Sequence, residues 1–323
     1  MIKIFLAGLA GIALFGNVAL AQVNEKAPQG GSMTVTYKDD VATLDPAIGY
    51  DWQNWSMIKS LFDGLMGYEP GTTKLRNELS ASNTISTDGT IHVFKMKNGI
   101  KFHNGREITA ADVKYSIERV TNPKTQSPGA GFFGMIDGFD SWNAGKGSEL
   151  SGVKVIDEKT VEIQLSRPDA TFLHVMALNF ASIVPKEAVD AAGEDFGRKP
   201  VGSGAFKLAE WTPGQRVVFE AFDEYHRTGV PKLENVTFEI GLEPMVALLR
   251  LQQGMADTLG DGIPPAQFMQ VMNDPNQSKN VIEGGQLHTG YITMNTRMAP
   301  FDNVMVRKAV NMAVNKAVSY THL

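Results

Sequence analysis

The chain of 323 residues contains no cysteine. This absence excludes disulfide bonds, thiol nucleophiles and cysteine-ligated metal sites. It also excludes a lipid attached through an N-terminal cysteine, which is a common way of tethering an exported protein to a membrane. An exported protein without such a tether needs a second membrane to retain it, which indicates the periplasm of a Gram-negative bacterium.

Basic clusters and long apolar runs are also missing. The net charge of -5 is mild and is spread along the chain without a Lys/Arg cluster, so nucleic acid is not expected as a partner. After the first 20 residues, no stretch is long and apolar enough to span a bilayer. We therefore expect a soluble mature protein of about 300 residues, enough for two domains.

The first residues have the pattern of a secretory signal. Lys3 precedes an apolar run from Ile4 to Leu20, and the run ends in an A-x-A site at Ala21. The alternative is a membrane anchor, but the run is short and contains glycines and Asn17. We expect export and cleavage after Ala21, which makes residues 1–21 a signal peptide.

Motifs for covalent or metal chemistry are weak. The six histidines show no i, i+4 pair, so we expect no metal site and no cofactor. Gly129 to Gly134 fits G-x-G-x-x-G, but the preceding segment is polar and contains proline. A nucleotide site would need a strand there, so a flexible loop is expected instead. Ser203 lacks the glycine that a nucleophile elbow requires at position 201.

Periodicity predicts several elements. Strands are expected at Met33–Tyr37, Arg216–Phe222 and Val236–Ile240, and a hairpin at Val153–Leu165. Helices are expected from Asn54 to Met66 with Gly67 as C-cap, from Thr109 with a capping box to Asp112, from Pro244 to Gln253, and from near Val304. The region 121–150 is rich in Gly, Pro, Ser and Asn, which predicts a loop with little regular structure.

Two blocks in the second half of the chain carry a resemblance. The first is Val201-Gly202-Ser203-Gly204-Ala205-Phe206-Lys207-Leu208, and the second runs from Tyr291 through Asn295 and Pro300 to Val310. With Leu44-Asp45-Pro46, Leu61-Phe62-Asp63-Gly64-Leu65 and four further landmarks in order, they resemble the solute-binding proteins of the dipeptide, oligopeptide and nickel family of ABC importers. The resemblance covers nearly all of Met33 to Lys316.

The resemblance implies an α/β fold of the type II periplasmic binding protein class, with two lobes and a large first lobe that has an inserted subdomain. By this analogy, residues 22–43 and 166–290 form the core subdomain of the first lobe, and residues 44–165 form the inserted subdomain. Residues 291–323 begin the second lobe. In the family a whole further lobe follows, and Ser319 to Leu323 depart from the family pattern, so we expect a C-terminally truncated copy whose last residues are not native.

The resemblance also implies a ligand site between the lobes. Candidates are the loop after the first strand, with adjacent carboxylates that can meet an ammonium group, the glycine block, whose backbone can approach a ligand closely, and aromatic side chains that can stack on one. For each, the alternative is ordinary structure: a solvated turn for the carboxylates and core packing for the aromatics. The candidate residues are Lys38, Asp39, Asp40, Trp52, Phe132, Phe133, Gly202, Ser203, Gly204 and Asn295.

The implied function is a monomeric periplasmic receptor that captures a short peptide or similar small solute. It would deliver the solute to an ABC permease and ATPase complex in the inner membrane, without covalent chemistry. Two alternatives remain open from the sequence. One is a secreted hydrolase, since carboxylates are plentiful, and the other is a receptor homologue that acts as a sensor or chaperone.

Overall fold

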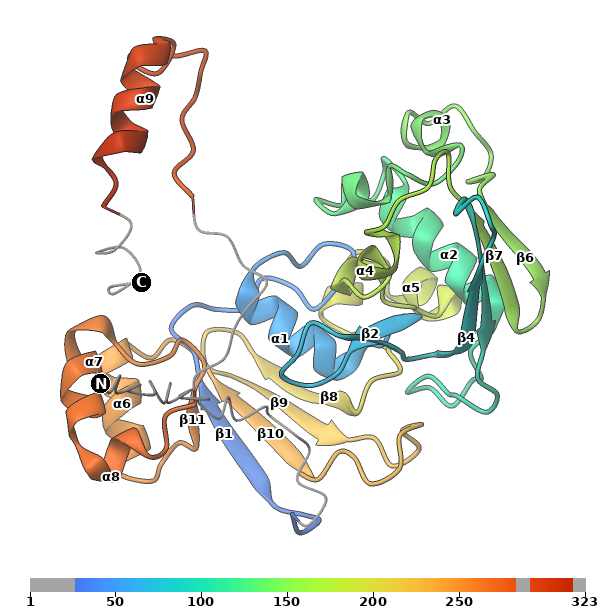
Figure 1. The fold of residues 1–323 in the computed structure, drawn as a ribbon. Coiled ribbons are helices and arrows are strands. Elements are labelled where there is room, and N and C mark those ends of the chain that lie inside the picture. Colours follow the sequence, from blue (N-terminus) through green and yellow to red (C-terminus); the bar gives the residue numbers. More distant parts are fainter. Residues whose placement is uncertain (1–26, 283–290, 316–323) are drawn as a thin grey trace, which may run out of the picture.

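The structure is a computed structural model that describes residues 27–282 and 291–315. The expected signal peptide and residues 319–323 lie outside the described residues. Two sheets organise the larger part, as Figure 1 shows. In the two described ranges, no helix is both long enough and apolar enough to cross a bilayer.

The first sheet has five strands in the order β11-β1-β10-β9-β8. Strand β1 runs parallel to both β10 and β11, whereas β9 is antiparallel to β10 and to β8. The strands are β1 (Ser32–Thr36), β8 (Phe206–Thr212), β9 (Arg216–Ala221), β10 (Asn235–Glu239) and β11 (Thr258–Leu259). The sheet therefore joins the beginning of the chain to segments about 200 residues later.

The second sheet has four antiparallel strands in the order β4-β5-β7-β6. A separate antiparallel pair, β2 and β3, comes just before β4 in the chain. The strands are β2 (Met66–Tyr68), β3 (Leu75–Asn77), β4 (Ser80–Ile85), β5 (Ile91–Met96), β6 (Val153–Asp157) and β7 (Thr160–Gln164). The expected hairpin at Val153–Leu165 is thus confirmed. The two sheets occupy different halves of this part of the molecule (Figure 1).

The helices are mostly short. They are α1 (Trp52–Leu61), α2 (Ala110–Thr121), α3 (Phe139–Asn143), α4 (Phe172–Val175), α5 (Lys186–Ala192), α6 (Pro244–Gln252), α7 (Pro265–Asn273), α8 (Pro275–Ser278) and α9 (Val304–Ala313). The capping box of α2 is confirmed, because the Asp112 side chain accepts from the backbone N–H of Thr109 at 2.9 Å.

Two expectations about the elements are wrong. Helix α1 ends at Leu61 rather than near Met66, and Gly67 lies inside β2 instead of capping a helix. The backbone turns extended at Phe62, and Gly64 forms a β-bridge with Ser182. The region 121–150 also contains a 3-10 helix, η1 (Ala130–Phe133), and the short helix α3, so it is more regular than its composition predicts.

Two hydrophobic cores lie in the described part of the chain. One contains Val35 of β1, Phe219 of β9 and Phe238 of β10, together with Met57 and Leu61 of α1. The other surrounds the four-stranded sheet and extends to Phe172–Ile183. Leu44 and the apolar residues of 57–62 therefore pack with the five-stranded sheet, whereas Ala47 and residues 172–183 pack with the other sheet. The subdomain boundaries at 43/44 and 165/166 stay predictions. At each boundary, residues from both sides pack in the same hydrophobic core.

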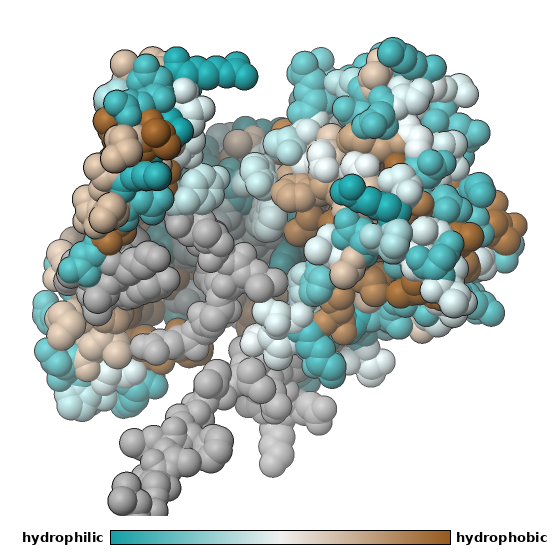
Figure 2. Space-filling view, turned by 45° about the horizontal axis from the view of Figure 1, so that its top comes forward, coloured by the Kyte–Doolittle hydropathy of each residue, from teal (hydrophilic) through white to brown (hydrophobic). Residues whose placement is uncertain are grey.

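The segment 291–315 contains α9, whose N-cap Asn303 accepts from the backbone N–H of Met305 at 2.8 Å. Hydrophobic side chains are visible over the helix in the space-filling view (Figure 2). Met305 is 65% exposed and Met312 is 86% exposed. None of the helix residues is buried among the described residues. The apolar side of α9 therefore has no covering partner within the described ranges.

Candidate functional site

The parallel strands place three loops at one edge of the five-stranded sheet. Because β1, β10 and β11 run in the same direction, the loops that follow Thr36, Glu239 and Leu259 lie at their carboxyl ends. In open α/β sheets, ligands bind in the crevice outside this edge. The edge is therefore the first candidate for a ligand site.

Charged side chains gather at this edge. The backbone N–H of Lys38 donates to the Asp261 carboxylate at 2.7 Å, and the Lys38 ammonium group lies 3.4 Å from Glu243. Asp39 is exposed, and it makes no side-chain hydrogen bond within the described residues. We call Lys38, Asp39, Glu243 and Asp261 the strand-end surface. Three carboxylates against one ammonium group make it a surface that favours a cationic ligand group.

Asp40, in contrast, is used by the fold. One of its carboxylate oxygens accepts from the backbone N–H of Val41 at 2.8 Å, and the other accepts from that of Gly214 at 2.9 Å. Gly214 lies in the turn between β8 and β9. Asp40 therefore has a structural role, in which it fixes the loop after β1 to this turn, and its expected contact with a ligand ammonium group stays a prediction.

Tyr37 connects the strand-end surface to helix α1. Its hydroxyl group is 2.9 Å from the Ser56 hydroxyl group, and a Cβ atom at Gly260 would lie 2.3 Å from its ring. Burial raises the pKa of Tyr37, and the negative charge of Asp261 raises it further, while the Ser56 hydrogen bond opposes both. Tyr37 is therefore a neutral, fixed side chain between β11 and α1.

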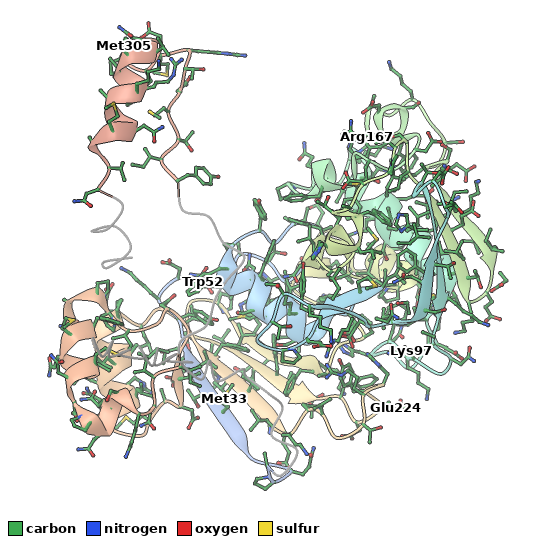
Figure 3. The ribbon with its side chains drawn as sticks, in the orientation of Figure 1. Met33, Trp52, Lys97, Arg167, Glu224 and Met305 are labelled. Atoms are coloured by element: carbon green, nitrogen blue, oxygen red, sulfur yellow. The ribbon has the colours of Figure 1, made fainter. Side chains whose placement is uncertain are left out.

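Trp52 stands at the start of α1, one helical turn from Ser56 (Figure 3). Its neighbour Asp51 caps the helix by accepting from the backbone N–H of Asn54 at 2.8 Å. Trp52 is 51% exposed. The cap fixes the backbone from which the indole group projects, so a large aromatic surface is held open to solvent.

Tyr50, two residues before Trp52, belongs to an aromatic cluster with Phe180 and Phe132. Tyr50 lies 5.4 Å from Phe180 and Phe132 lies 6.0 Å from Phe180, measured between ring centroids. Tyr50 is 55% exposed and Phe132 is 39% exposed, whereas Phe180 is buried. We call Tyr50, Trp52 and Phe132 the aromatic rim. The sequence analysis missed Tyr50, although its position between Gly49 and the cap Asp51 was a usable signal.

Phe133 does not belong to this rim. Its side chain is fully buried in the core around the four-stranded sheet, so the expectation that it contacts ligand is wrong. The 3-10 helix η1 points neighbouring side chains in different directions, and Phe132 and Phe133 therefore face different surroundings. Gly129 packs against Phe180, since a Cβ atom there would lie 2.3 Å from its ring. This contact, and not phosphate binding, explains the first glycine of the G-x-G-x-x-G match.

The glycine block is buried. A Cβ atom at Gly202 would lie 1.9 Å from the carbonyl oxygen of Leu61, and one at Gly204 would lie 2.5 Å from the Leu61 carbonyl carbon. Ser203 has no exposed surface, and its hydroxyl group has no hydrogen-bond partner among the described residues. The backbone approached by these glycines is the end of α1. The expectation that the backbone of the glycine block approaches a ligand is therefore corrected, because it approaches α1 instead.

Asn295 forms a local turn. Its side-chain oxygen accepts from the backbone N–H of Arg297 at 3.0 Å, and its backbone oxygen accepts from that of Met298 at 3.1 Å. Two cavities lie apart from the rim and the strand-end surface. One of about 350 Å³ is lined by residues of α2, of the segment 122–125 that follows it, and by Trp142. The other, of about 410 Å³, lies along α9 and includes Met294. Neither is lined by a predicted ligand residue.

The family model for bacterial extracellular solute-binding proteins, family 5, in its middle region, matches residues 74–319. The chain belongs to this family. A family 5 relative, the glutathione-binding protein GsiB of Pectobacterium atrosepticum, is 32% identical over 275 residues, which are 85% of this chain and 50% of the relative. GsiB of Salmonella typhimurium is 28% identical over 88% of this chain and 52% of the relative. The chain spans about half the length of the curated relatives it matches.

Solved structures agree with the family and the fold. The murein tripeptide binding protein MppA of Escherichia coli matches with a TM-score of 0.71 and 26% identity, over 77% of this chain and 48% of that one. A periplasmic oligopeptide-binding protein of Borrelia burgdorferi matches with a TM-score of 0.77 at 24% identity, over 88% of this chain and 57% of that one. The second likeness shows the fold alone. The predicted α/β fold of the periplasmic binding protein class is confirmed.

Proposed function

We propose that this family 5 protein is the solute-binding component of an ABC importer and captures a short peptide or similar small solute in the periplasm. The observation that carries the proposal is the family match over residues 74–319. Relatives and structural neighbours bind glutathione, a murein tripeptide or oligopeptides, according to their names. The partners would be an inner-membrane permease and its ATPase.

The surface chemistry supports this proposal. A peptide carries an ammonium group at one end and side chains along its length. The strand-end surface offers carboxylates of Asp39, Glu243 and Asp261 for a cationic group, and the aromatic rim offers flat apolar surface. Lys38 and Asp39 of the strand-end surface and Tyr50 and Trp52 of the aromatic rim lie on one loop, residues 37–51, and the start of α1. We infer that Lys38, Asp39 and Trp52 remain the candidate ligand residues of this part, with Phe132 and the newly identified Tyr50, Glu243 and Asp261.

Binding can be measured on the protein at the full length that its gene encodes. Calorimetric titration with glutathione, a tripeptide and a set of longer peptides is expected to give saturable binding for at least one class. Trp52→Ala should weaken that binding by about tenfold, equivalent to about 1.4 kcal/mol. Ile156→Ala is a matched control, because Ile156 is 56% exposed on β6. Equal losses in both variants would remove the aromatic rim from the site.

The hydrolase alternative has a direct test in the same sample. Prolonged incubation with peptide and glycoside substrates should return them intact, and turnover would overturn the receptor proposal. The location is tested by mass spectrometry of periplasmic protein, in which Gln22 is expected as the first residue. Protein that retains Met1 in a membrane fraction would contradict cleavage after Ala21.

A further inference from the structure

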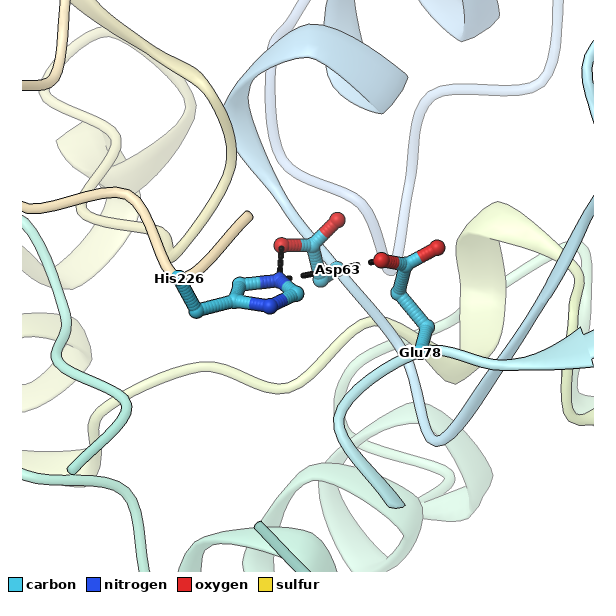
Figure 4. Close-up of side chains that lie close together, drawn as sticks. All are labelled: Asp63, Glu78 and His226. Carbon is cyan, nitrogen blue, oxygen red and sulfur yellow. Dashed lines mark hydrogen bonds and ion pairs between the residues drawn. The ribbon is translucent and has the colours of Figure 1, made fainter. Parts of the chain in front are cut away.

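Three potential metal ligands from separate segments meet in the interior. Asp63 follows α1, Glu78 lies between β3 and β4, and His226 lies in the loop between β9 and β10 (Figure 4). Trp52 is the first residue of α1, and Asp63 lies two residues after its last residue. A ten-residue helix is about 15 Å long, so the two residues lie at opposite ends of that length. The group therefore lies apart from the aromatic rim.

The spacing of the donor atoms suits one small cation. The Nε2 atom of His226 lies 3.1 Å from a carboxylate oxygen of Asp63 and 3.7 Å from one of Glu78. The three donor atoms all lie within 4.8 Å of one another. Ligands about 2.0 to 2.2 Å from a tetrahedral zinc ion stand about 3.3 Å apart. Small inward movements would bring the three atoms to that geometry.

The surroundings hold the ligands in place. Their side chains are only 5% to 10% exposed. The other carboxylate oxygen of Glu78 lies 2.5 Å from the Arg76 guanidinium group, and a Cβ atom at Gly67 would lie 2.8 Å from that oxygen. An outer partner of this kind orients a metal-binding carboxylate. The glycine at 67 leaves the room that Glu78 needs.

The charge balance leaves room for a cation. Two buried carboxylates face each other, and burial is costly for each unless a positive charge compensates it. Arg76 contacts Glu78, and the hydrogen-bond partner found for the Asp63 side chain within the described ranges is His226. A metal ion would stabilise both carboxylates together.

We propose that Asp63, Glu78 and His226 bind a divalent transition-metal ion of the zinc class, with water as a fourth ligand. One imidazole and two carboxylates form a mixed donor set that zinc accepts. The ion would connect the end of α1, the segment before β4 and the loop after β9. The absence of paired histidines in the sequence predicted no metal site, but these ligands are separated by 15 and 148 residues, as their numbers show.

The test uses untagged protein, at the full length that its gene encodes, after treatment with a chelator. Titration with zinc chloride is expected to show one equivalent bound at micromolar affinity or tighter, with a higher melting temperature. His226→Gln should weaken binding at least about 100-fold. His174→Gln is the matched control, because His174 is exposed and contacts Tyr68. Stoichiometric binding lost in His226→Gln and retained in the control would support the site.

A spectroscopic measurement on the wild-type protein does not depend on whether a variant folds. Cobalt(II) added to the wild-type protein should give the intense visible absorption of a four-coordinate ion, and zinc should displace it. Asp63→Asn, which preserves the shape of the side chain, should abolish that absorption. The proposal is wrong if the wild-type protein binds no stoichiometric zinc or cobalt, or if folded His226→Gln binds zinc as tightly as the wild type does. The three side chains would then form a hydrogen-bonded ionic cluster.

Discussion

Protonation of His103 should destabilise the fold. The backbone N–H of Gly202 donates to the Nδ1 atom of His103 at 3.2 Å, and the Nε2 atom donates to the Gly204 carbonyl oxygen at 3.0 Å. The ring is therefore neutral, and a second proton on Nδ1 would face the N–H of Gly202. Burial, as the largest cause, and Lys207 together lower the pKa of His103 from 6.5 to about 4, although the bond to Gly204 partly opposes them.

The direction and the size of this stability change follow from the linkage between proton binding and folding. Below pH 6.5 the unfolded chain takes up a proton at this histidine, whereas the folded chain does so only near pH 4. Stability is therefore lost as the pH falls from about 6.5 towards 4. The pKa values of 6.5 and about 4 differ by about 2.5, which at about 1.36 kcal/mol for each pH unit corresponds to at most about 3.4 kcal/mol. Because the side chain is not fully buried, we expect about 2 kcal/mol by pH 4.5.

Urea denaturation of the wild type and His103→Gln at pH 7, 6, 5 and 4.5 measures this effect. Carboxylates contribute to acid sensitivity in both proteins, so the difference between the two curves isolates His103. The wild type should lose about 2 kcal/mol more than the variant between pH 7 and 4.5. His174→Gln, at an exposed position, should follow the wild type. Parallel curves for wild type and His103→Gln would refute the reasoning.

Two further substitutions test packing at the same junction and beneath α2. Gly202→Ala should cost more than about 2 kcal/mol of unfolding free energy, because its Cβ atom would overlap a backbone oxygen of α1. Gly131→Ala is the control, since nothing lies within 4 Å of a Cβ atom there, and a stable Gly202→Ala protein would contradict the packing. Asp45→Asn should cost about 3 to 5 kcal/mol in denaturant titrations, because Arg119 loses its buried carboxylate partner. Asp190→Asn is the control, because it breaks the exposed ion pair with Lys186 and should cost under about 1 kcal/mol of unfolding free energy. Similar costs for Asp45→Asn and Asp190→Asn would contradict the prediction.

The sequence predicted helices and strands well where the deciding residues lie close together in the chain. The capping box at Thr109 and Asp112 and the hairpin at 153–165 both depend on residues that are near in sequence. The end of α1 was predicted badly because Leu65 continues the apolar period. Leu65 is apolar because it is buried in the core of the four-stranded sheet. Apolar periodicity cannot distinguish such a residue from one more turn of helix.

The same limit applies to the candidate site residues: local sequence selects some of them, but only the packing decides which are exposed. Trp52 and Phe132 could be selected as aromatics near turns, but only the packing separates exposed Phe132 from buried Phe133. Glycines fit anywhere that two chains approach closely, so the sequence of the glycine block did not reveal whether the neighbour was a ligand or α1. The neighbour is α1, and the His103 contacts bind the same block to the loop before α2. These glycines therefore connect the end of α1 to the loop before α2, and ligand contact by the strand-end surface and the aromatic rim stays a proposal.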